Sequence, residues 1–374
     1  MRAGDCARAR PPFPLIKATG TPYEAGYAIG TQCRHQLAHL LACTQEQAGS
    51  YWGTLVDRSR LYLEASRMHL PRRVQELEGA AAGAALPFSE LFSIFCLEEL
   101  ELMHRAGSAR GRRGCTDFAA AGKATVKREV YACHNEDWNQ EEAGDLVVVS
   151  VRIQGEIPFL AVAYGGLLPG MGMNQAGLAV TGNALDQNDL RVGVPRVLLV
   201  REAMSCPGLA EALEVAALPA RASSYNNVFT SVQGDIYNFE GSATDFEISY
   251  SSTISVHTNH YLSPRMRAYE ADPLEMGTAV RYHTARRLLE DQMGHITLET
   301  CQRILADHTH APYSICRHPR PDRPPTQTVT TFSAICDLTH RRLLVCPGNP
   351  CQGEYAEYTL APERTSAPGG ISFA

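Results

Sequence analysis

A cysteine that directly follows a glycine, at a change in the character of the chain, could carry nucleophilic chemistry. Gly114-Cys115-Thr116 comes after residues 106–113, a small, glycine-containing and basic stretch that we expect to be an exposed loop. Because glycine tolerates strained backbone angles, the Cys115 thiolate could reach the Gly114 carbonyl, form a thioester and let water release two chains. The freed α-amine of Cys115 would suit a general base, since its reference pKa is ~7.7–8.0. With twelve cysteines and thirty glycines a chance Gly-Cys pair is common, so a buried, inert thiol is the alternative.

Three further clusters of polar residues follow predicted strands or apolar runs. His134-Asn135-Glu136-Asp137-Trp138 stands at the end of a predicted strand, as a site or as a solvated turn. In His257-Thr258-Asn259-His260-Tyr261, the Asn259 amide could donate to an oxyanion, a contribution of ~2.7–4 kcal/mol, or cap a turn. In Tyr313-Ser314-Ile315-Cys316-Arg317, Arg317 could bind a carboxylate in a bidentate way or form an exposed ion pair.

Taken in order, these clusters resemble the acyl-coenzyme A:6-aminopenicillanic acid acyltransferase (isopenicillin-N acyltransferase) family of N-terminal-nucleophile cysteine hydrolases. Its members look like Gly-Cys-Thr at a processing point, then Asn-x-Asp followed by an aromatic, then His-Thr-Asn-His, then Ser-Ile-Cys-Arg. Weaker echoes at residues 20–26, 172–178 and 348–350 extend the resemblance over most of the chain.

The resemblance implies a four-layer αββα sandwich and self-cleavage between Gly114 and Cys115. The two fragments, residues 1–114 and 115–374, would form one compact heterodimer. Cys115 would be the nucleophile and Asn259 an oxyanion donor. Asp137 would be needed for processing and for organising the nucleophile, and Arg317 would line the substrate pocket. No metal and no cofactor is expected.

Two departures from the family pattern concern the carboxylates. The segment between Cys115 and Asp137 looks longer than in the fungal acyltransferase, and Glu136 stands where an aromatic is common. Period-two alternation puts Asp137 on the face of Cys133 and Asn135, with Glu136 opposite. Which carboxylate faces Cys115 therefore stays open, and Asp137 is favoured because it precedes an aromatic.

The pattern along the chain predicts an α+β fold with a helical N-terminal region. Helices are expected at residues 36–47, 55–69, 72–85, from Pro87 onward, 195–205, 208–217, 278–293 and 298–308. Strands are expected at residues 125–134, 145–154, 158–164, 177–185, 228–233, 235–240, 245–250, 255–260, 329–336 and 341–346. Hairpins interrupted by a helix pair suit two antiparallel sheets packed face to face with helices outside.

Composition narrows the partners. The 374 residues are 44% hydrophobic and 20% charged, with a net charge of −6, which gives no reason to expect nucleic acid or a membrane as a partner. No apolar run approaches the ~20 residues of a membrane helix, and residues 1–15 show no targeting segment. The scattered cysteines contain no C-x-x-C pair, so we expect reduced thiols and a cytoplasmic protein.

The leading hypothesis is a hydrolase or acyltransferase that acts on the amide bond of a small N-acyl compound through a thioester. Acyl-CoA-dependent transfer as the main activity is an alternative, but the sequence shows no phosphate-binding glycine loop. A zinc metallohydrolase could use His257 and His260 with His134 or Asp137, although a spacing of three in a strand puts the two rings on opposite faces. A binding protein that keeps the fold without catalysis is the last alternative.

Overall fold

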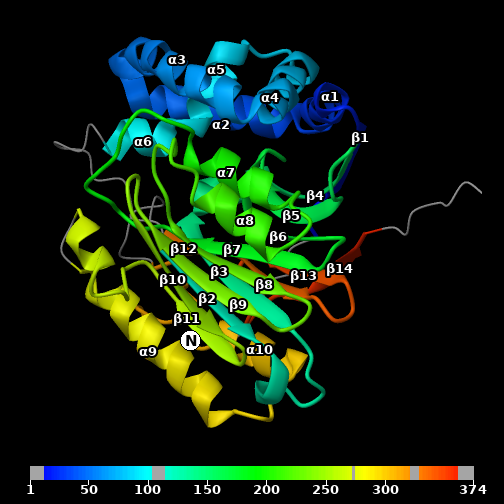
Figure 1. The fold of residues 1–374 in the computed structure, drawn as a ribbon, viewed down its shortest axis with the longest axis vertical. Helices are drawn as coiled ribbons and strands as arrows, with labels where there is room; N and C mark the ends of the chain where they lie inside the picture. The colour runs from blue at the N-terminus through cyan, green and yellow to red at the C-terminus, as the bar shows by residue number, and fades with distance from the viewer. Residues whose placement is uncertain (1–11, 103–113, 272–273, 321–327, 361–374) are drawn as a thin grey trace, which may run out of the picture.

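Two β-sheets pack face to face between helices in the computed structural model, which describes residues 12–102, 114–271, 274–320 and 328–360 (Figure 1). The larger sheet has the order β1 (Leu15–Gly20), β4 (Leu146–Ile153), β5 (Phe159–Tyr164), β6 (Leu168–Asn174), β7 (Leu178–Asn183), β8 (Asn226–Ser231), β9 (Ile236–Gly241) and β10 (Phe246–Ser251). The smaller has the order β11 (Ile254–His257), β2 (Gly114–Ala120), β3 (Tyr131–Asn139), β12 (Thr328–Asp337), β13 (Arg342–Pro347) and β14 (Ala356–Thr359). Among the paired strands of the described residues, β1 and β4 alone run parallel, and all other pairs are antiparallel.

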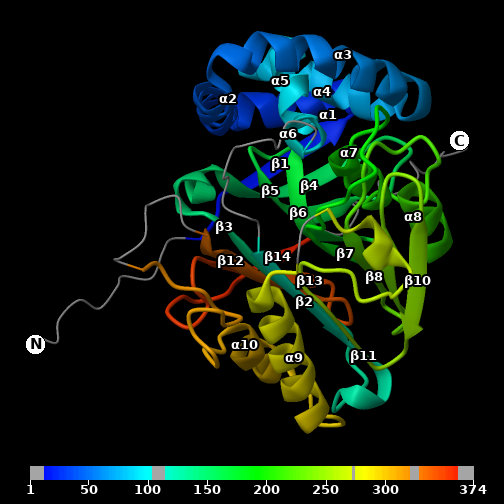
Figure 2. The same cartoon turned by 90° about the vertical axis from the view of Figure 1, so that its left-hand side faces the viewer.

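The three largest clusters of buried hydrophobic side chains in the described chain define the layers. Helices α7 (Arg196–Ala203) and α8 (Leu209–Ala216) pack on the outer face of the larger sheet. Helices α9 (Met276–Asp291) and α10 (Leu298–Leu305) cover the outer face of the smaller sheet (Figure 2). Between the sheets lies a third core that includes Phe332. Because both faces of the sheets are covered, strands such as β4 read as apolar runs without alternation. The predicted α+β sandwich of αββα type is confirmed.

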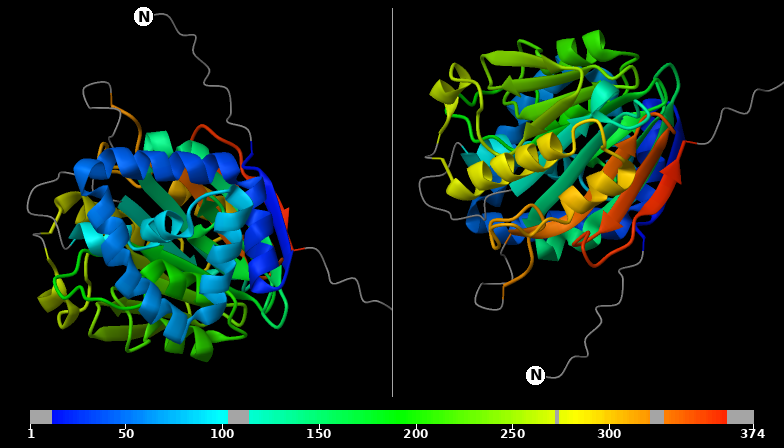
Figure 3. Two further views of the ribbon diagram at one scale, coloured as in Figure 1. Left: turned by 90° about the horizontal axis from the view of Figure 1, so that it is seen from above. Right: turned by 90° about the horizontal axis from the view of Figure 1, so that it is seen from below.

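The N-terminal helices form a further layer over one end of the sandwich (Figure 3). They are α1 (Pro22–Gln32), α2 (Arg34–Ala48), α3 (Trp52–His69), α4 (Pro71–Ala84), α5 (Phe88–Phe95) and α6 (Leu97–Leu102). Thr21 begins α1 with a capping box, in which its side chain accepts from the Glu24 amide and the Glu24 side chain accepts from the Thr21 amide. No helix in the described part of the chain has both the length and the apolar composition to cross a bilayer.

Most expected elements are present, with instructive differences. The helix expected from Pro87 is split at Cys96 into α5 and α6. The strand expected over residues 125–134 begins later, as β3, so the cluster that starts at His134 lies inside a strand and does not follow one. Strands β1, β2, β6 and β14 and helix α1 are not among the expected elements. The loop predicted over residues 106–113 lies outside the described residues.

Helices α1 and α4 cross with their backbones in contact. Gly26 and Gly30 on α1 lie against the backbone of α4, and Gly79 and Gly83 on α4 lie against the backbone of α1. A Cβ atom added to Gly79 would lie 2.0 Å from the Tyr23 carbonyl oxygen, a distance that no side chain can occupy. Since these atoms belong to backbone, only a shift of a whole helix could relieve the clash.

Gly79→Ala should therefore lower the free energy of unfolding by about 1–3 kcal/mol, the usual cost of overpacking. Gly53→Ala on α3 is the matched control, because a Cβ there meets nothing within 4 Å. The control should gain up to about 1 kcal/mol from helix propensity. Urea denaturation of both variants measures the difference, and equal stabilities would contradict backbone contact between α1 and α4.

Candidate active site

The register of β2 against β3 places Cys115 in a row of titratable side chains. Cys115 is opposite Glu136 and Asp117 is opposite His134, so all four face the space between the sheets. The Cys115 Sγ lies 3.7 Å from Glu136 Oε2, and that oxygen lies 2.9 Å from His134 Nε2. On its other side, His134 Nδ1 contacts Asp117 Oδ1. The sequence offered His134 only as a possible zinc ligand and gave no sign of Asp117, so neither residue was expected in this row.

Burial and charge decide the protonation states in this row. Burial raises the pKa of the Cys115 thiol well above its ordinary value, and Glu136 and Asp117 add to the effect. Burial by itself lowers the pKa of His134, but the carboxylates of Asp117 and Glu136 outweigh it and raise that pKa to about 10. At neutral pH the Cys115 thiol is therefore neutral and the His134 ring is protonated.

Asp137, the carboxylate that the sequence favoured, lies on the face of the sheet opposite to Glu136, as the alternation predicted. Its Oδ1 accepts a hydrogen bond of 2.7 Å from Thr330 Oγ1, and its Oδ2 lies 3.9 Å from Arg317 Nη1. A Cβ on Gly114 would lie 3.2 Å from the Asp137 carboxylate and 2.7 Å from Arg317 Nη1. Asp137 and Arg317 thus sit beside Gly114, while Glu136 is the carboxylate on the face of the Cys115 thiol.

Asp137 is poised between burial and neighbouring cations. Burial raises the pKa of Asp137 to about 6, against the opposing pull of Arg317 and Arg281. Its Oδ2 atom is buried and has no hydrogen-bond partner among the described residues. A buried oxygen that accepts no hydrogen bond costs free energy. An N–H or O–H donor formed close to Asp137 Oδ2 would therefore be bound by it.

Asn259 holds the backbone of Cys115. Its Oδ1 atom accepts a hydrogen bond of 2.8 Å from the Cys115 amide, and its Nδ2 donates to the Ala184 carbonyl at 3.2 Å. The Asn259 amide in turn donates to Thr278 Oγ1 at 2.7 Å, which fixes this residue beyond the end of β11. The side-chain oxygen, rather than the nitrogen, therefore faces Cys115, and the oxyanion role of Asn259 stays a prediction.

A second group on the Cys115 backbone, Arg281 of α9, was missed by sequence reasoning. This buried guanidinium donates to the Cys115 carbonyl oxygen, to Thr116 Oγ1 at 3.1 Å and to Asn259 Oδ1 at 3.0 Å. The signal in the sequence is periodic. Arg281 falls at helical spacing in a stripe of small buried residues, Gly277, Thr278, Thr284 and Ala285, where a lone charge requires a partner.

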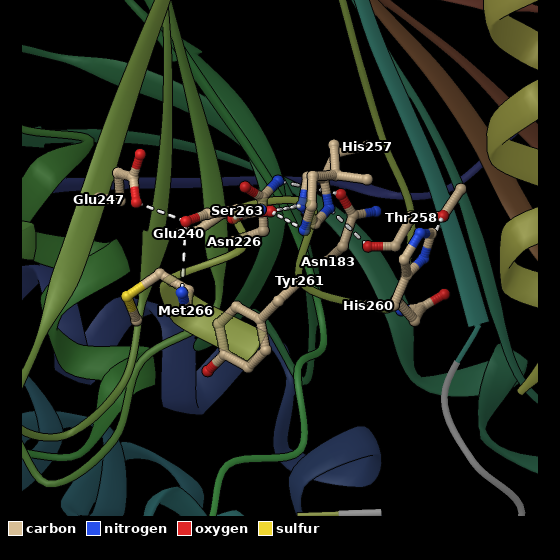
Figure 4. Close-up of polar contacts among 12 residues, drawn as sticks. Asn183, Asn226, Glu240, Glu247, His257, Thr258, His260, Tyr261, Ser263 and Met266 are labelled. Carbon is tan, nitrogen blue, oxygen red and sulfur yellow. Dashed lines mark hydrogen bonds and ion pairs between the residues drawn. The ribbon is translucent and has the colours of Figure 1, made fainter. Parts of the chain in front are cut away.

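The histidines of the His-Thr-Asn-His motif are held in structural contacts. His257 Nε2 lies 2.6 Å from Glu240 Oε1, and its Nδ1 contacts the Thr258 carbonyl (Figure 4). Burial lowers the pKa of His260 to about 4, so this ring is neutral. The expectation that the two rings lie on opposite faces is wrong. They stack with centroids 6.5 Å apart, because β11 ends at His257 and alternation stops there.

These contacts bear on the zinc metallohydrolase alternative. Among the described residues, two groups of side chains bring three or more possible metal-ligand atoms together. One is Cys115, His134 and Glu136, and the other is a separate cluster that contains Cys316. Neither contains His257, His260 or Asp137, so the ligand set proposed for that alternative does not converge.

A cavity opens at the Cys115 thiol between the sandwich and the N-terminal helices. It encloses about 1100 Å³ of unoccupied space, its open mouth included. Its walls are mostly apolar and aromatic, and include Leu40, Ile94, Phe95, Trp138, Tyr164, Pro169, Val197 and Tyr225. Its charged residues are Glu98, Glu136, Glu142 and Arg196. Arg317 is not among the lining residues, and its ionic neighbour is the internal carboxylate of Asp137.

Comparison with known proteins shows the family. Residues 124–352 match the acyl-coenzyme A:6-aminopenicillanic acid acyl-transferase family. The chain belongs to this family. Members of this family are enzymes. One relative is the acyl-coenzyme A:6-aminopenicillanic-acid-acyltransferase 40 kDa form of Emericella nidulans, which is 25% identical over 90% of this chain and 92% of that protein. The beta-alanyl-dopamine/carcinine hydrolase of Drosophila melanogaster is 26% identical over 58% of this chain and 60% of that protein.

Two solved structures are also similar to this acyltransferase-family chain, at low sequence identity. A variant of the conjugated bile acid hydrolase from Clostridium perfringens shares 9% identity and a TM-score of 0.46, over 67% of this chain and all of that one. The penicillin V acylase from Agrobacterium tumefaciens shares 12% identity and a TM-score of 0.43, over 62% of this chain and 82% of that one.

The row beside Cys115 makes a prediction about alkaline stability. The pKa of His134 rises from an ordinary 6.5 to about 10 on folding, so its stabilising effect is complete below about pH 6.5 and is lost as the pH rises through about 10. His134→Gln should lower the free energy of unfolding near pH 6 and flatten its decline above pH 7, as measured by urea denaturation. Exposed His295, changed to Gln, is the control. Parallel pH profiles for wild type and His134→Gln would contradict the imidazolium.

Proposed function

We propose that this acyltransferase-family enzyme cleaves itself between Gly114 and Cys115 and then acts on C–N amide bonds of small N-acyl compounds. The observation that carries the proposal is the placement of Cys115. Its thiol faces the cavity, while Asn259 and Arg281 hold its backbone nitrogen and oxygen. A nucleophile whose backbone is gripped on both sides, at the start of a strand, can be converted into an N-terminal residue without being displaced.

Self-cleavage begins with attack of the Cys115 sulfur on the Gly114 carbonyl carbon. The C–N bond to Cys115 then breaks, the nitrogen takes the proton that the thiol gave up, and a thioester joins the two residues. Water hydrolyses the thioester, which leaves a carboxylate on Gly114 and restores the thiol. Since the thiol is neutral at rest, it has to give up a proton, which ends on the Cys115 nitrogen, and Glu136, whose Oε2 lies 3.7 Å from the sulfur, is one carboxylate that can pass it on.

Turnover uses the same sulfur with the new α-amine. The amine takes the thiol proton as sulfur attacks the substrate carbonyl, and then passes it to the departing amine. Asn259 Oδ1, at 2.8 Å from this nitrogen, is the acceptor that orients the amine, and Asp137 Oδ2, which accepts no hydrogen bond among the described residues, is the second acceptor that we assign to it. Water resolves the acyl thioester in hydrolysis, and a second amine resolves it in transfer.

Processing is tested by intact mass. Purified wild-type protein should yield two fragments, residues 1–114 and residues 115–374, the second beginning with Cys115. Cys115→Ala should remain a single inactive chain. Full-length wild-type protein with robust amidase activity would refute the mechanism, because no α-amine would exist to act as the base.

The two carboxylates give a matched pair for the same assay. Asp137→Asn should slow self-cleavage more than Glu136→Gln does, because Asp137 flanks Gly114 and takes up the new amine. A larger defect for Glu136→Gln would assign the main part in processing to the carboxylate on the thiol face. Far-ultraviolet circular dichroism of both variants checks that the fold is kept.

Charge in the cavity favours substrates that carry an amine. Three glutamates line it against one arginine. Glu98 is paired with Arg196 through two hydrogen bonds of 3.0 Å, and Glu136 is paired with His134, so Glu142 is the acidic residue best placed for a substrate cation. A β-alanyl amide, the substrate named for the Drosophila relative, carries such an amine. We therefore favour hydrolysis of small amides of this kind, with acyl transfer, including transfer from acyl-CoA, as the secondary activity.

The substrate assignment is tested with β-alanyl amides against N-acyl amino acids that bear a carboxylate. Wild type should favour the cationic set by about tenfold or more in kcat/KM, equivalent to ~1.4 kcal/mol. Glu142→Gln should reduce that preference while leaving an acceptor for the 2.7 Å hydrogen bond from Trp138 Nε1. Equal losses on both sets would show that Glu142 is structural, and a preference for carboxylates would overturn the assignment.

A further inference from the structure

Four side chains of metal-binding type converge outside the candidate active site. They are His308, Cys316, His318 and Cys351, whose ligand atoms all lie within 4.8 Å of one another. The first three belong to the segment between α10 and β12, and the fourth belongs to the turn after β13. These two segments lie side by side next to the smaller sheet (Figure 2). The spacing of these residues in the sequence did not predict the cluster, because Cys351 is far from the other three along the chain.

Four distances within this cluster are within about 0.4 Å of those in a four-coordinate site. The two sulfurs of Cys316 and Cys351 lie 3.7 Å apart, and the Nε2 atoms of His308 and His318 lie 2.9 Å apart. His318 Nε2 is 3.2 Å from Cys351 Sγ and 3.7 Å from Cys316 Sγ. A tetrahedral zinc ion with ordinary bond lengths separates two sulfurs by ~3.8 Å, two nitrogens by ~3.3 Å, and sulfur from nitrogen by ~3.5 Å.

The surroundings of the cluster support thiolate ligation. Asn349 Nδ2 lies 3.4 Å from Cys316 Sγ and donates to the Arg317 carbonyl oxygen at 2.8 Å. An amide donor aimed at a sulfur stabilises the deprotonated form, as groups around metal-bound cysteines do. The Cys316 amide also donates to the Asp307 carbonyl at 3.0 Å, which closes the segment and brings His308 back to the cysteine.

We propose that His308, Cys316, His318 and Cys351 form a structural Zn²⁺ site. Two thiolates neutralise the dication, and two neutral imidazoles complete the shell. Sulfur and imidazole donors select zinc over magnesium or calcium. Because four protein ligands fill a tetrahedron, no position is left for substrate, and the ion takes no part in amide chemistry.

The site has a consequence for Arg317. Its two neighbours in sequence, Cys316 and His318, are both ligands, so the ion clamps the backbone on either side of this arginine. Clamped in this way, the guanidinium is kept beside Gly114 and Asp137. The zinc site is therefore a positioning device for the Gly114 side of the sheet. It does not depend on self-cleavage, since its ligands all belong to the described chain on the Cys115 side.

Metal content of the full-length chain, expressed with zinc in the medium and dialysed, tests the proposal directly. Mass spectrometry of the metal should find about one zinc per chain, as a closed site with two thiolates holds its ion through purification. Cys351→Ser and His308→Ala should each lose most of it. Cys43→Ser and His295→Gln, outside the cluster, should retain it. Measuring the same content in Cys115→Ala separates this result from any failure of processing.

Cobalt gives a second readout that does not rely on variants that might misfold. Wild-type protein stripped by chelator and reloaded with Co²⁺ should show the visible bands of a tetrahedral site and a sulfur-to-cobalt charge-transfer band. Stripping should also lower the melting temperature, and zinc should restore it. Wild-type protein without zinc and without the cobalt spectrum would overturn the proposal. So would an intact mass showing that Cys316 and Cys351 are joined in a disulfide.

Discussion

The antiparallel register of β2 and β3 is the constraint on which the candidate site depends. It sets Cys115 opposite Glu136 and Gly114 opposite Asp137. Because side chains alternate between the faces of a sheet, the Cys115 thiol and Glu136 share the inner face. Gly114, the residue before Cys115, instead lies next to Asp137 and Arg317 on the outer face. A slip of one residue would exchange these environments completely. The same pairing therefore sorts the two adjacent carboxylates into different surroundings.

Polar groups from other layers then hold that register in place. Asn259 reaches Cys115 from beyond β11, and Arg281 reaches it from α9. Burying the Arg281 guanidinium is costly, and burial is the main cause that lowers its pKa, with Asp137 acting in the opposite direction. The charge is tolerated because its donors meet three oxygen acceptors around Cys115. Removing the side chain of Asn259 or of Arg281 would leave buried polar atoms without a hydrogen-bond partner. These two side chains and the backbone of Cys115 therefore stabilise one another.

Local patterns in the sequence predicted local structure well, and long-range placement poorly. Helices α2, α3 and α4 were expected because good helix formers run between clear boundaries. The start of strand β3 was predicted too early, because Thr125, Val126 and Val130 are β-branched residues typical of a strand. In the structure residues 122–124 form a helical turn, and the strand begins only at Tyr131. Strand β6 was missed because its proline and glycines argue against a strand.

The site itself shows the same division. Motif order was sufficient to bring Cys115, Asp137 and Asn259 to one region, and alternation correctly put Glu136 and Asp137 on opposite faces. Which of the two faced the thiol depended on the pairing partner, which no pattern within β3 contains. Arg281 and the cluster with Cys351 depend on contacts between segments far apart in the chain, so spacing could not reveal them.

Covalent continuity at Gly114 is not what joins the helical layer to the sandwich. Strand β1 pairs with β4 of the larger sheet along six residues, and its hydrogen bonds do not involve Gly114. The N-terminal helices share one hydrophobic core with the outer face of that sheet, in which Ile29 and Leu37 pack with Val149. Burial of such side chains contributes roughly 1.5–3 kcal/mol each, so a single cut would leave the two parts associated. Since Leu40 and Phe95 of the helical layer also line the cavity at Cys115, that association is what would keep the cavity walled after cleavage.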